Sequence, residues 1–348
     1  MTILQFILWS LLKVVVVTVV FLMGVAYTVL LERKLVGRIQ NRWGPSRVGP
    51  FGLLQPLVDG AKSFLKEDLI PSGVYKPLYL LAPILSLGCS LVSIAVVPFG
   101  APMTIAGSPL LFEISDVNIG LLVILGITSI GVYGIALAGW SSNNKYSLLG
   151  SLRASAQLIS YELALGLSLV GVVMLSGSLN LREIVEKQAS HGILSWNILG
   201  GFQILAFFLY LMSAFAETNR SPFDLPEAES ELAGGYNIEY SSMKFAMFFM
   251  AEYGNMITVG CVATMLFLGG WTSPFGNLIP MPKIFLLQAL LPIFWFVLKV
   301  FCFLFLYVWV RGTLPRFRYD QLMNFGWRWL MPLAILNIVG TSLWLAWR

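Results

Sequence analysis

Eight long apolar segments run through this chain of 348 residues, and they constrain its fold more than any other feature of the sequence. Each has at least the roughly 20 residues that an α-helix needs to cross a bilayer. Since lipid offers the backbone no hydrogen-bond partner, such segments cross membranes as helices. The sequence therefore predicts an all-α polytopic membrane protein. Its eight predicted transmembrane helices cover residues 3–31, 77–99, 117–140, 157–177, 197–216, 242–269, 284–310 and 328–347.

The composition is typical of a membrane protein. Hydrophobic residues make up 57% of the chain and charged residues only 11%, against about 25% charged residues in a soluble domain. The net charge of +5 does not indicate nucleic-acid binding, because the basic residues do not cluster in an aromatic-rich soluble domain. The loops between the apolar segments are too short to fold separately, so we expect a single integral membrane domain over residues 1–348.

The sequence has none of the usual motifs of a redox centre. Cys89, Cys261 and Cys302 lie in apolar segments without a CxxC pair, which argues against a metal site. His191 is the single histidine, and a bis-histidine haem needs two. No GxGxxG or Walker sequence is present. We therefore expect no bound metal, haem, flavin or iron–sulfur cluster in this chain.

Lysine and arginine predict the orientation, since they are enriched in loops on the inner side of a membrane. If the loop after the first segment is placed inside and the others alternate, sixteen of the 22 Lys and Arg residues lie inside and four lie outside. Lys13 and Lys299 fall within apolar segments. This bias predicts an even number of helices with both termini outside.

Residues 49–66 are too polar to cross the membrane but show a helical stripe of apolar residues. Asp59, Lys62 and Lys66 lie off that stripe. The pattern predicts an amphipathic helix in the membrane interface. An ordinary surface helix that covers the bundle is the alternative interpretation.

An acidic loop at residues 216–241, AETNRSPFDLPEAESELAGGYNIEYS, separates the fifth and sixth predicted helices. It holds six of the chain's 17 acidic residues. A solvated surface loop is the commoner meaning of such a charge run. The alternative is a loop that handles protons or a polar ligand at the membrane surface.

Charged residues within the predicted helices favour the second interpretation, because a charge at the bilayer centre costs about 3 kcal/mol on insertion scales. Glu162 comes early in the fourth predicted helix, and Glu252 lies about eleven residues into the sixth. Lys299 is at a similar depth in the seventh. Glu252 and Lys299 could neutralise each other and hold two helices together, or they could relay protons.

We expect the carboxyl groups to form one proton path from the acidic loop to the middle of the membrane. Neighbouring carboxylates raise each other's proton affinity, so such a set would respond to one charge added nearby. The residues assigned to this path are Glu162, Glu217, Glu227, Glu229, Glu231, Glu239, Glu252 and Lys299.

Two arginine-rich loops belong to the same membrane face. The first, LERKLVGRIQNRWGPSRVGP at 31–50, places Trp43 beside Arg42 and a Gly-Pro pair. The second is RGTLPRFR at 311–318. Orientation explains some of the arginines but neither Trp43 nor the amphipathic helix that follows. We infer that a lipid-like ligand with a polar head could enter between that helix and the bundle.

These segments resemble a known family. The first loop with its amphipathic helix, GWSSNNKYSLLGSLRASAQLISYEL, the acidic loop with FFMAEYGNM, and VRGTLPRFRYDQLM are similar to the H subunits of proton-translocating NADH:quinone oxidoreductases. The mitochondrial homologue in that family is ND-one of respiratory complex I. The matching segments are long and spread over nearly the whole chain.

The resemblance implies eight transmembrane helices, an amphipathic helix and a location in the bacterial inner membrane with periplasmic termini. It implies a quinone as substrate, ubiquinone or menaquinone. The implied partners are peripheral-arm subunits with the quinone site and iron–sulfur clusters, antiporter-like and small membrane subunits, and lipid. Carried over by motif, the quinone cavity would be formed by Glu32, Arg33, Arg38, Arg42, Asp59, Arg220, Phe223, Asp224, Arg311 and Arg316.

Three other functions fit parts of the sequence. The membrane subunit of an energy-converting hydrogenase or formate hydrogenlyase is related, but the unbroken first loop and RGTLPRFRYDQ argue against it. A secondary transporter should show repeats and broken helices, and the sequence shows neither. A purely structural anchor would leave Glu162 and Glu252 unexplained.

Overall fold

The computed structural model describes residues 3–105, 108–110, 112–190, 192–224, 234–276 and 285–347. Most of them are helical, as the sequence predicts. The α-helices are α1 (Ile3–Ile39), α2 (Gln55–Leu65), α3 (Lys76–Ser93), α4 (Gly120–Ser141), α5 (Lys145–Ser176), α6 (Leu181–Lys187), α7 (Gln203–Glu217), α9 (Ser242–Phe267), α10 (Phe285–Thr313), α11 (Tyr319–Phe325) and α12 (Met331–Trp347).

Seven helices among the described residues are long and apolar enough to cross a membrane. Six of these spans centre on α1, α3, α4, α5, α9 and α10, and the seventh runs from α11 through a π-helical turn at Gly326–Leu330 into α12. The remaining predicted span, residues 197–216, corresponds to α7, which has only 15 residues and is therefore about 22 Å long. The all-α architecture is confirmed, with one helix shorter than expected.

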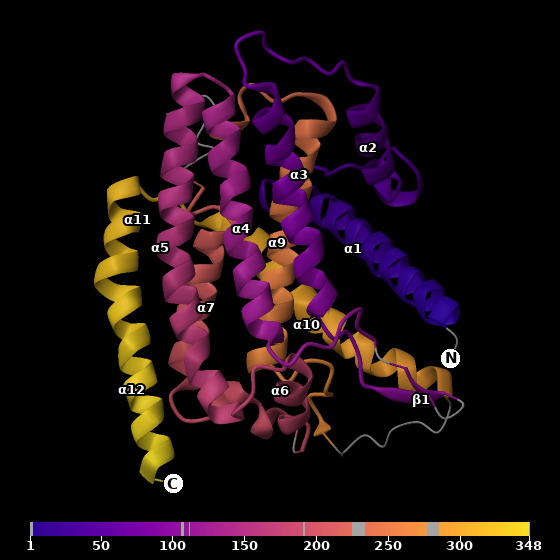
Figure 1. The fold of residues 1–348 in the computed structure, drawn as a ribbon, viewed down its shortest axis with the longest axis vertical. Helices are drawn as coiled ribbons and strands as arrows, with labels where there is room; N and C mark the ends of the chain where they lie inside the picture. The colour runs from indigo at the N-terminus through magenta and orange to yellow at the C-terminus, as the bar shows by residue number, and fades with distance from the viewer. Residues whose placement is uncertain are drawn as a thin grey trace.

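The helices α3, α4, α5, α7 and α9 form the centre of the bundle (Figure 1). Large side chains such as Tyr161, Tyr210, Met256 and Met265 are fully buried there. Helices α1 and α10 slant across one side of this centre and contact α9 and each other, whereas α12 packs against α5 (Figure 1). The central helices bury apolar side chains on several of their faces, and this packing fixes their positions relative to one another.

Helix α5 begins at Lys145, twelve residues before the predicted start at 157, so the predicted start of this helix was wrong. Asn144 caps the helix by accepting a hydrogen bond from the backbone N–H of Tyr146 at 3.0 Å. Small residues on the early turns are buried: the Ser147 hydroxyl donates to Tyr236 O at 3.3 Å. Glu162 consequently lies near the middle of α5 and not at its start.

Helix α1 extends to Ile39, past the predicted end at 31, so that Glu32 and Arg33 lie on the helix itself. A 3₁₀ turn at Pro50–Gly52 precedes α2, which confirms a helix within 49–66. The residues of α2 are all exposed or half-buried. Hydrogen bonds hold this helix: the Ser242 hydroxyl donates to the carbonyls of Ser63 and Lys66, each at 2.9 Å.

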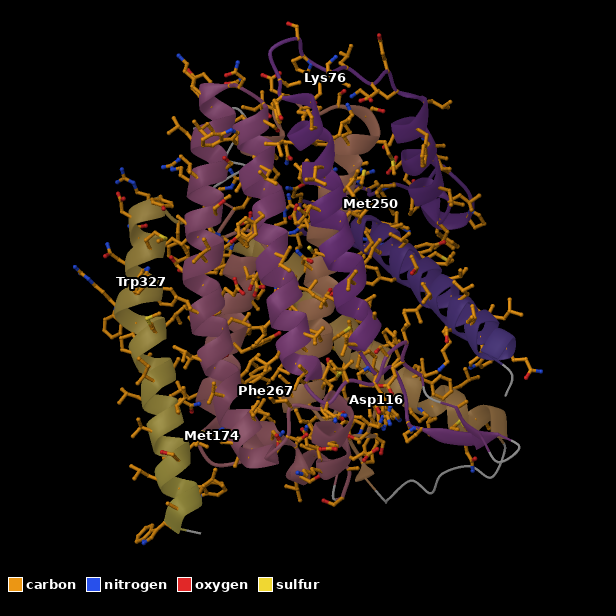
Figure 2. The ribbon with its side chains drawn as sticks, viewed as in Figure 1. Lys76, Asp116, Met174, Met250, Phe267 and Trp327 are labelled. Atoms are coloured by element: carbon orange, nitrogen blue, oxygen red, sulfur yellow. The ribbon has the colours of Figure 1, made fainter. Side chains whose placement is uncertain are left out.

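The end of the bundle opposite α2 carries short elements that the sequence did not predict. Strands β1 (Met103–Ile105) and β2 (Ser108–Leu110) pair antiparallel. Helix α6 and two 3₁₀ turns, Gly192–Ser195 and Asn197–Leu199, follow α5. The labelled residues Lys76, at the start of α3, and Asp116 lie at opposite ends of the bundle (Figure 2).

Candidate functional site

A basic cavity of about 580 Å³ opens between the end of α1, the segment after α7 and the end of α10. Five residues assigned by sequence to a ligand cavity meet here, although Glu32 and Arg311 are 279 positions apart in the chain. The lining consists of Glu32, Arg33, Val36, Gln40, Arg42, Ser221, Arg311, Gly312, Leu314, Pro315 and Arg316. Four arginines against one glutamate make this lining positive, so it favours a ligand with electron-rich oxygen atoms.

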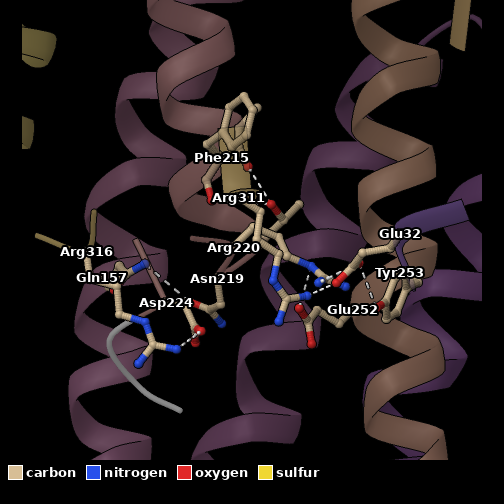
Figure 3. Close-up of polar contacts among 12 residues, drawn as sticks. Glu32, Gln157, Phe215, Asn219, Arg220, Asp224, Glu252, Tyr253, Arg311 and Arg316 are labelled. Carbon is tan, nitrogen blue, oxygen red and sulfur yellow. Dashed lines mark hydrogen bonds and ion pairs between the residues drawn. The ribbon is translucent and has the colours of Figure 1, made fainter. Parts of the chain in front are cut away.

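Arg220 is only 5% exposed and lies behind the lining of the basic cavity, where it contacts the lining residue Glu32. Its Nη1 contacts Glu32 Oε2 at 3.2 Å, and its Nε contacts Glu252 Oε1 at 2.7 Å (Figure 3). The guanidinium carbon lies 4.0 Å from the ring centre of Tyr253. One buried arginine therefore joins a carboxylate of α1 to a carboxylate of α9.

Glu32 is the shared acceptor of this network. The Tyr253 hydroxyl donates to Glu32 Oε2 at 2.8 Å, and Arg311 forms an ion pair with Glu32 Oε1 (Figure 3). Buried carboxylates are stable when such partners compensate for lost hydration. The two acids, Glu32 and Glu252, and the two bases, Arg220 and Arg311, balance each other in formal charge.

The backbone after α7 turns sharply and so places Arg220. The Thr218 hydroxyl donates back to Ala214 O at 3.0 Å at the end of the helix. Asn219 then adopts the left-handed conformation with φ of 49°, which asparagine tolerates better than most residues. The N–H of Phe223 donates to Arg220 O at 2.8 Å and closes the next turn.

The last arginine-rich loop is bound to the same segment. Arg316 pairs with Asp224 at 3.0 Å, and the N–H of Phe317 donates to Pro222 O at 3.1 Å. The rings of Phe223 and Phe317 stack with centroids 5.6 Å apart. Phe223 and Asp224 thus support the wall of the basic cavity from behind and do not line it.

Two further residues predicted for the cavity are not part of its lining. Asp59 of α2 pairs with Arg33 at 2.6 Å and so connects the amphipathic helix to the lining. Arg38 lies outside the lining, with its guanidinium 5.6 Å from the ring centre of Trp43.

A second, smaller cavity, the carboxylate cavity, lies in the centre of the bundle and measures about 40 Å³. One buried water needs about 10–15 Å³, so two or three waters fit. Glu162 on this wall also accepts a hydrogen bond from the Ser129 hydroxyl. The lining carries three carboxyl groups and several polar side chains, among them Glu162, Glu217, Glu252, Thr128, Thr218, Asn219, Tyr236 and Asn255.

Arg220 connects one residue of each cavity, although it lines neither. Glu32 lines the basic cavity, Glu252 lines the carboxylate cavity, and Arg220 contacts both. A single buried guanidinium thus lies between a carboxylate of the basic cavity and a carboxylate of the carboxylate cavity.

Comparisons with known proteins agree on one family. The chain matches the NADH dehydrogenase family over residues 12–342. It is 64% identical over 351 aligned positions to an H subunit of the NADH-quinone oxidoreductase of Koribacter versatilis, with 98% of each chain covered. It is 49% identical to an H subunit of the same enzyme from Solibacter usitatus, over 99% of this chain and 98% of that one. The chain belongs to the H subunit family of NADH-quinone oxidoreductases. As a member of this family with seven helices long enough to span a bilayer in its described part, it is a multi-pass membrane protein.

Not all carboxyl groups assigned to the proton path lie at the carboxylate cavity. Glu239 Oε1 accepts a hydrogen bond from Asn144 Nδ2 at 2.7 Å, near the α2 end of the bundle. Tyr240, the next residue, stacks on Tyr79 with centroids 4.2 Å apart, and burial raises the pKa of Tyr240 to about 12. Glu227, Glu229 and Glu231 lie outside the described residues.

Lys299 does not pair with Glu252, so that interpretation was wrong. Its Nζ donates to the carbonyls of Leu268, Gly270 and Thr272 at 2.7–2.8 Å, just beyond the end of α9. Leu268 is about 24 Å along α9 from Glu252. The ammonium group also lies 4.3 Å from the ring centre of Trp196. Lys299 therefore caps a helix C-terminus, where a positive charge is stabilising.

Replacement of Lys299 with methionine is expected to destabilise the fold by about 3 kcal/mol, because the three carbonyls lose their donor. The thermal inactivation temperature of the purified complex should fall, while the number of protons pumped per electron stays unchanged. Loss of pumping at unchanged thermal stability would instead return Lys299 to the proton path.

Sequence reasoning missed Tyr253 and Gln157. Tyr253 follows Glu252 directly, and a polar aromatic residue beside an intramembrane acid is a signal that could have indicated its role. Gln157 stood at the predicted start of a helix, where a polar residue is unremarkable. Only the true start of α5 at Lys145 shows that Gln157 is a buried amide in the middle of a helix.

Proposed function

We propose that the chain is the membrane subunit of a proton-translocating NADH:quinone oxidoreductase in which the basic cavity admits the quinone. The names of the relatives support this activity. The convergence of Glu32, Arg33, Arg42, Arg311 and Arg316 on one cavity supports the place of entry. Partner subunits would supply the iron–sulfur clusters and reduce the quinone, ubiquinone or menaquinone.

Within this proposal, Arg220 couples the quinone to the proton path. Reduction of a quinone places negative charge on its oxygens until protons arrive. Such a charge in the basic cavity competes with Glu32 for Arg220 and Arg311. The strength of the ion pair between Arg220 and Glu252 therefore changes. The observation that carries the proposal is that Arg220 contacts one carboxylate of each cavity.

The proton path then runs through the carboxylate cavity. Glu252, Glu217 and Glu162 line a space with room for water, and protons move between carboxyl groups through short water bridges. The excess of Lys and Arg on one side supports a bacterial inner membrane orientation with periplasmic termini and the basic cavity toward the cytoplasm.

A photoreactive quinone tests the place of entry. An azidoquinone that serves as substrate of the purified complex should label this chain within residues 32–42 and 311–316 after illumination. An excess of ordinary quinone should suppress the label, because both compounds would occupy the same cavity. The proposal would be contradicted if illumination stopped quinone reduction while the label, although suppressed by ordinary quinone, lay only in other segments.

A further inference from the structure

Gln157 is a fully buried glutamine of α5 that contacts the segment carrying Arg220 at three points. Its Nε2 donates to Ala216 O and to Phe223 O, each at 2.9 Å, and to Asn219 Oδ1 at 3.3 Å (Figure 3). These acceptors lie on both sides of Arg220 in the sequence. One side-chain atom therefore ties together the two ends of the turn that presents the guanidinium.

The NH₂ end of the Gln157 amide makes all three contacts. An NH₂ group has two hydrogens, so three acceptors must share them. The opposite assignment of the amide would face its oxygen toward the backbone carbonyl oxygens of Ala216 and Phe223 and is excluded. Gln157 Oε1 is buried and has no hydrogen-bond partner among the described residues, which is unfavourable. The protein tolerates the unfavourable burial of Oε1 while Nε2 keeps the three hydrogen bonds that it donates.

The next turn of α5 contacts the same region. The Tyr161 hydroxyl donates to Leu322 O at 2.8 Å, and its ring lies 6.3 Å from that of Phe223. One face of α5 thus supports both the Arg220 turn and the start of the last span. Glu162, the neighbouring residue, lines the carboxylate cavity on another face of α5.

We propose that Gln157 is the positioning residue that holds the Arg220 guanidinium between Glu32 and Glu252. The inference rests on the proposed function of Arg220. Without the Nε2 donor, the carbonyls of Ala216 and Phe223 lose a shared partner and the turn between them is free to relax. Arg220 then no longer meets both carboxylates at contact distance, so charge in the basic cavity is no longer transmitted to Glu252.

The test compares Q157L with Q203L in the purified complex. Gln203 is a second fully buried glutamine, and its Nε2 donates to Thr341 Oγ1 at 3.0 Å, away from both cavities. NADH oxidation by a water-soluble acceptor measures the amount of intact electron-input arm. In Q157L we expect quinone turnover per complex to fall about tenfold or more, because small misplacements of a catalytic group are costly. The number of protons pumped per electron should also fall.

Q203L should lose thermal stability as Q157L does but keep wild-type quinone turnover and pumping per complex. Equal turnover per complex in Q157L and Q203L would overturn the proposal, since Gln157 would then be a structural residue only. Q157N keeps the amide on a shorter arm and carries the test if Q157L does not assemble. It should show lower turnover and pumping at a normal amount of complex, and wild-type values would overturn the proposal.

R220K, measured in parallel, separates this inference from the function on which it rests. If R220K keeps full quinone turnover and pumping, the proposed role of Arg220 fails. If R220K is impaired and Q157L is not, the role of Arg220 stands and the positioning role of Gln157 fails.

Discussion

Replacement of Arg220 with leucine is expected to abolish quinone turnover and to destabilise the protein by about 3–5 kcal/mol, because the loss of one partner from a buried ion pair leaves a charge uncompensated. Glu32 keeps Arg311 and Tyr253, but Glu252 loses its ion pair at 2.7 Å. The measurement is the amount of complex in the membrane, together with quinone turnover for each complex that assembles.

R220K keeps the charge and is the more informative variant. A lysine ammonium is a compact charge without the planar fork of a guanidinium, so it can satisfy Glu32 or Glu252 but not both in the present geometry. We expect R220K to assemble and to lose most of its proton pumping. Wild-type pumping in R220K would contradict a role for the two simultaneous contacts.

Arg182 provides the matched control for these variants. It too lies between two acids, Glu113 and Asp116, but it belongs to α6 at the opposite end of the bundle. R182L should lower the stability of the complex while each assembled complex keeps its quinone turnover. Equal losses of turnover in R182L and R220L would show that removal of any such arginine disturbs the site indirectly.

Replacement of Glu252 with glutamine is expected to uncouple the enzyme. The side chain keeps its shape but can neither carry a negative charge nor accept a proton in the pH range of the enzyme. Protons pumped per electron should fall below about a tenth of the wild-type value, in line with the usual effect of removing an acid–base group. The measurement is proton uptake and NADH oxidation in sealed proteoliposomes.

E186Q is the control for E252Q, because Glu186 is an exposed residue of α6. It should pump as the wild-type protein does. An E252Q complex that assembles and pumps fully would remove Glu252 from the proton path.

The fold was predictable from the sequence because hydrophobic length specifies a transmembrane helix. The errors have physical causes. The start of α5 reads as a loop because Ser147 and Gly150 are polar or small, yet their size lets α5 pack closely against the segment at Tyr236. The short α7 reads as a longer span because the apolar residues before Gln203 lie in 3₁₀ turns and loop.

The candidate site was predictable only in part. Sequence motifs identified Glu32, Arg220 and Arg311, but residue counts along the helices placed Lys299 at the depth of Glu252 and so allowed an ion pair between them. The number of residues from the start of a helix gives the same depth in the membrane in two helices only if they run parallel to each other. Helix α10 slants strongly across the bundle (Figure 1). Gln157 and Tyr253 act through contacts over long sequence separations, and no local pattern encodes such contacts.

The central claim is that Arg220 transmits the state of the quinone to Glu252. Infrared difference spectra of the purified complex, recorded on quinone reduction, test it most directly in the wild-type, R220K and E252Q proteins. We predict a carboxyl signal in the wild-type protein that is missing in E252Q and lost or strongly reduced in R220K when spectra are compared for the same amount of quinone reduced. An undiminished Glu252 signal in R220K would contradict the claim.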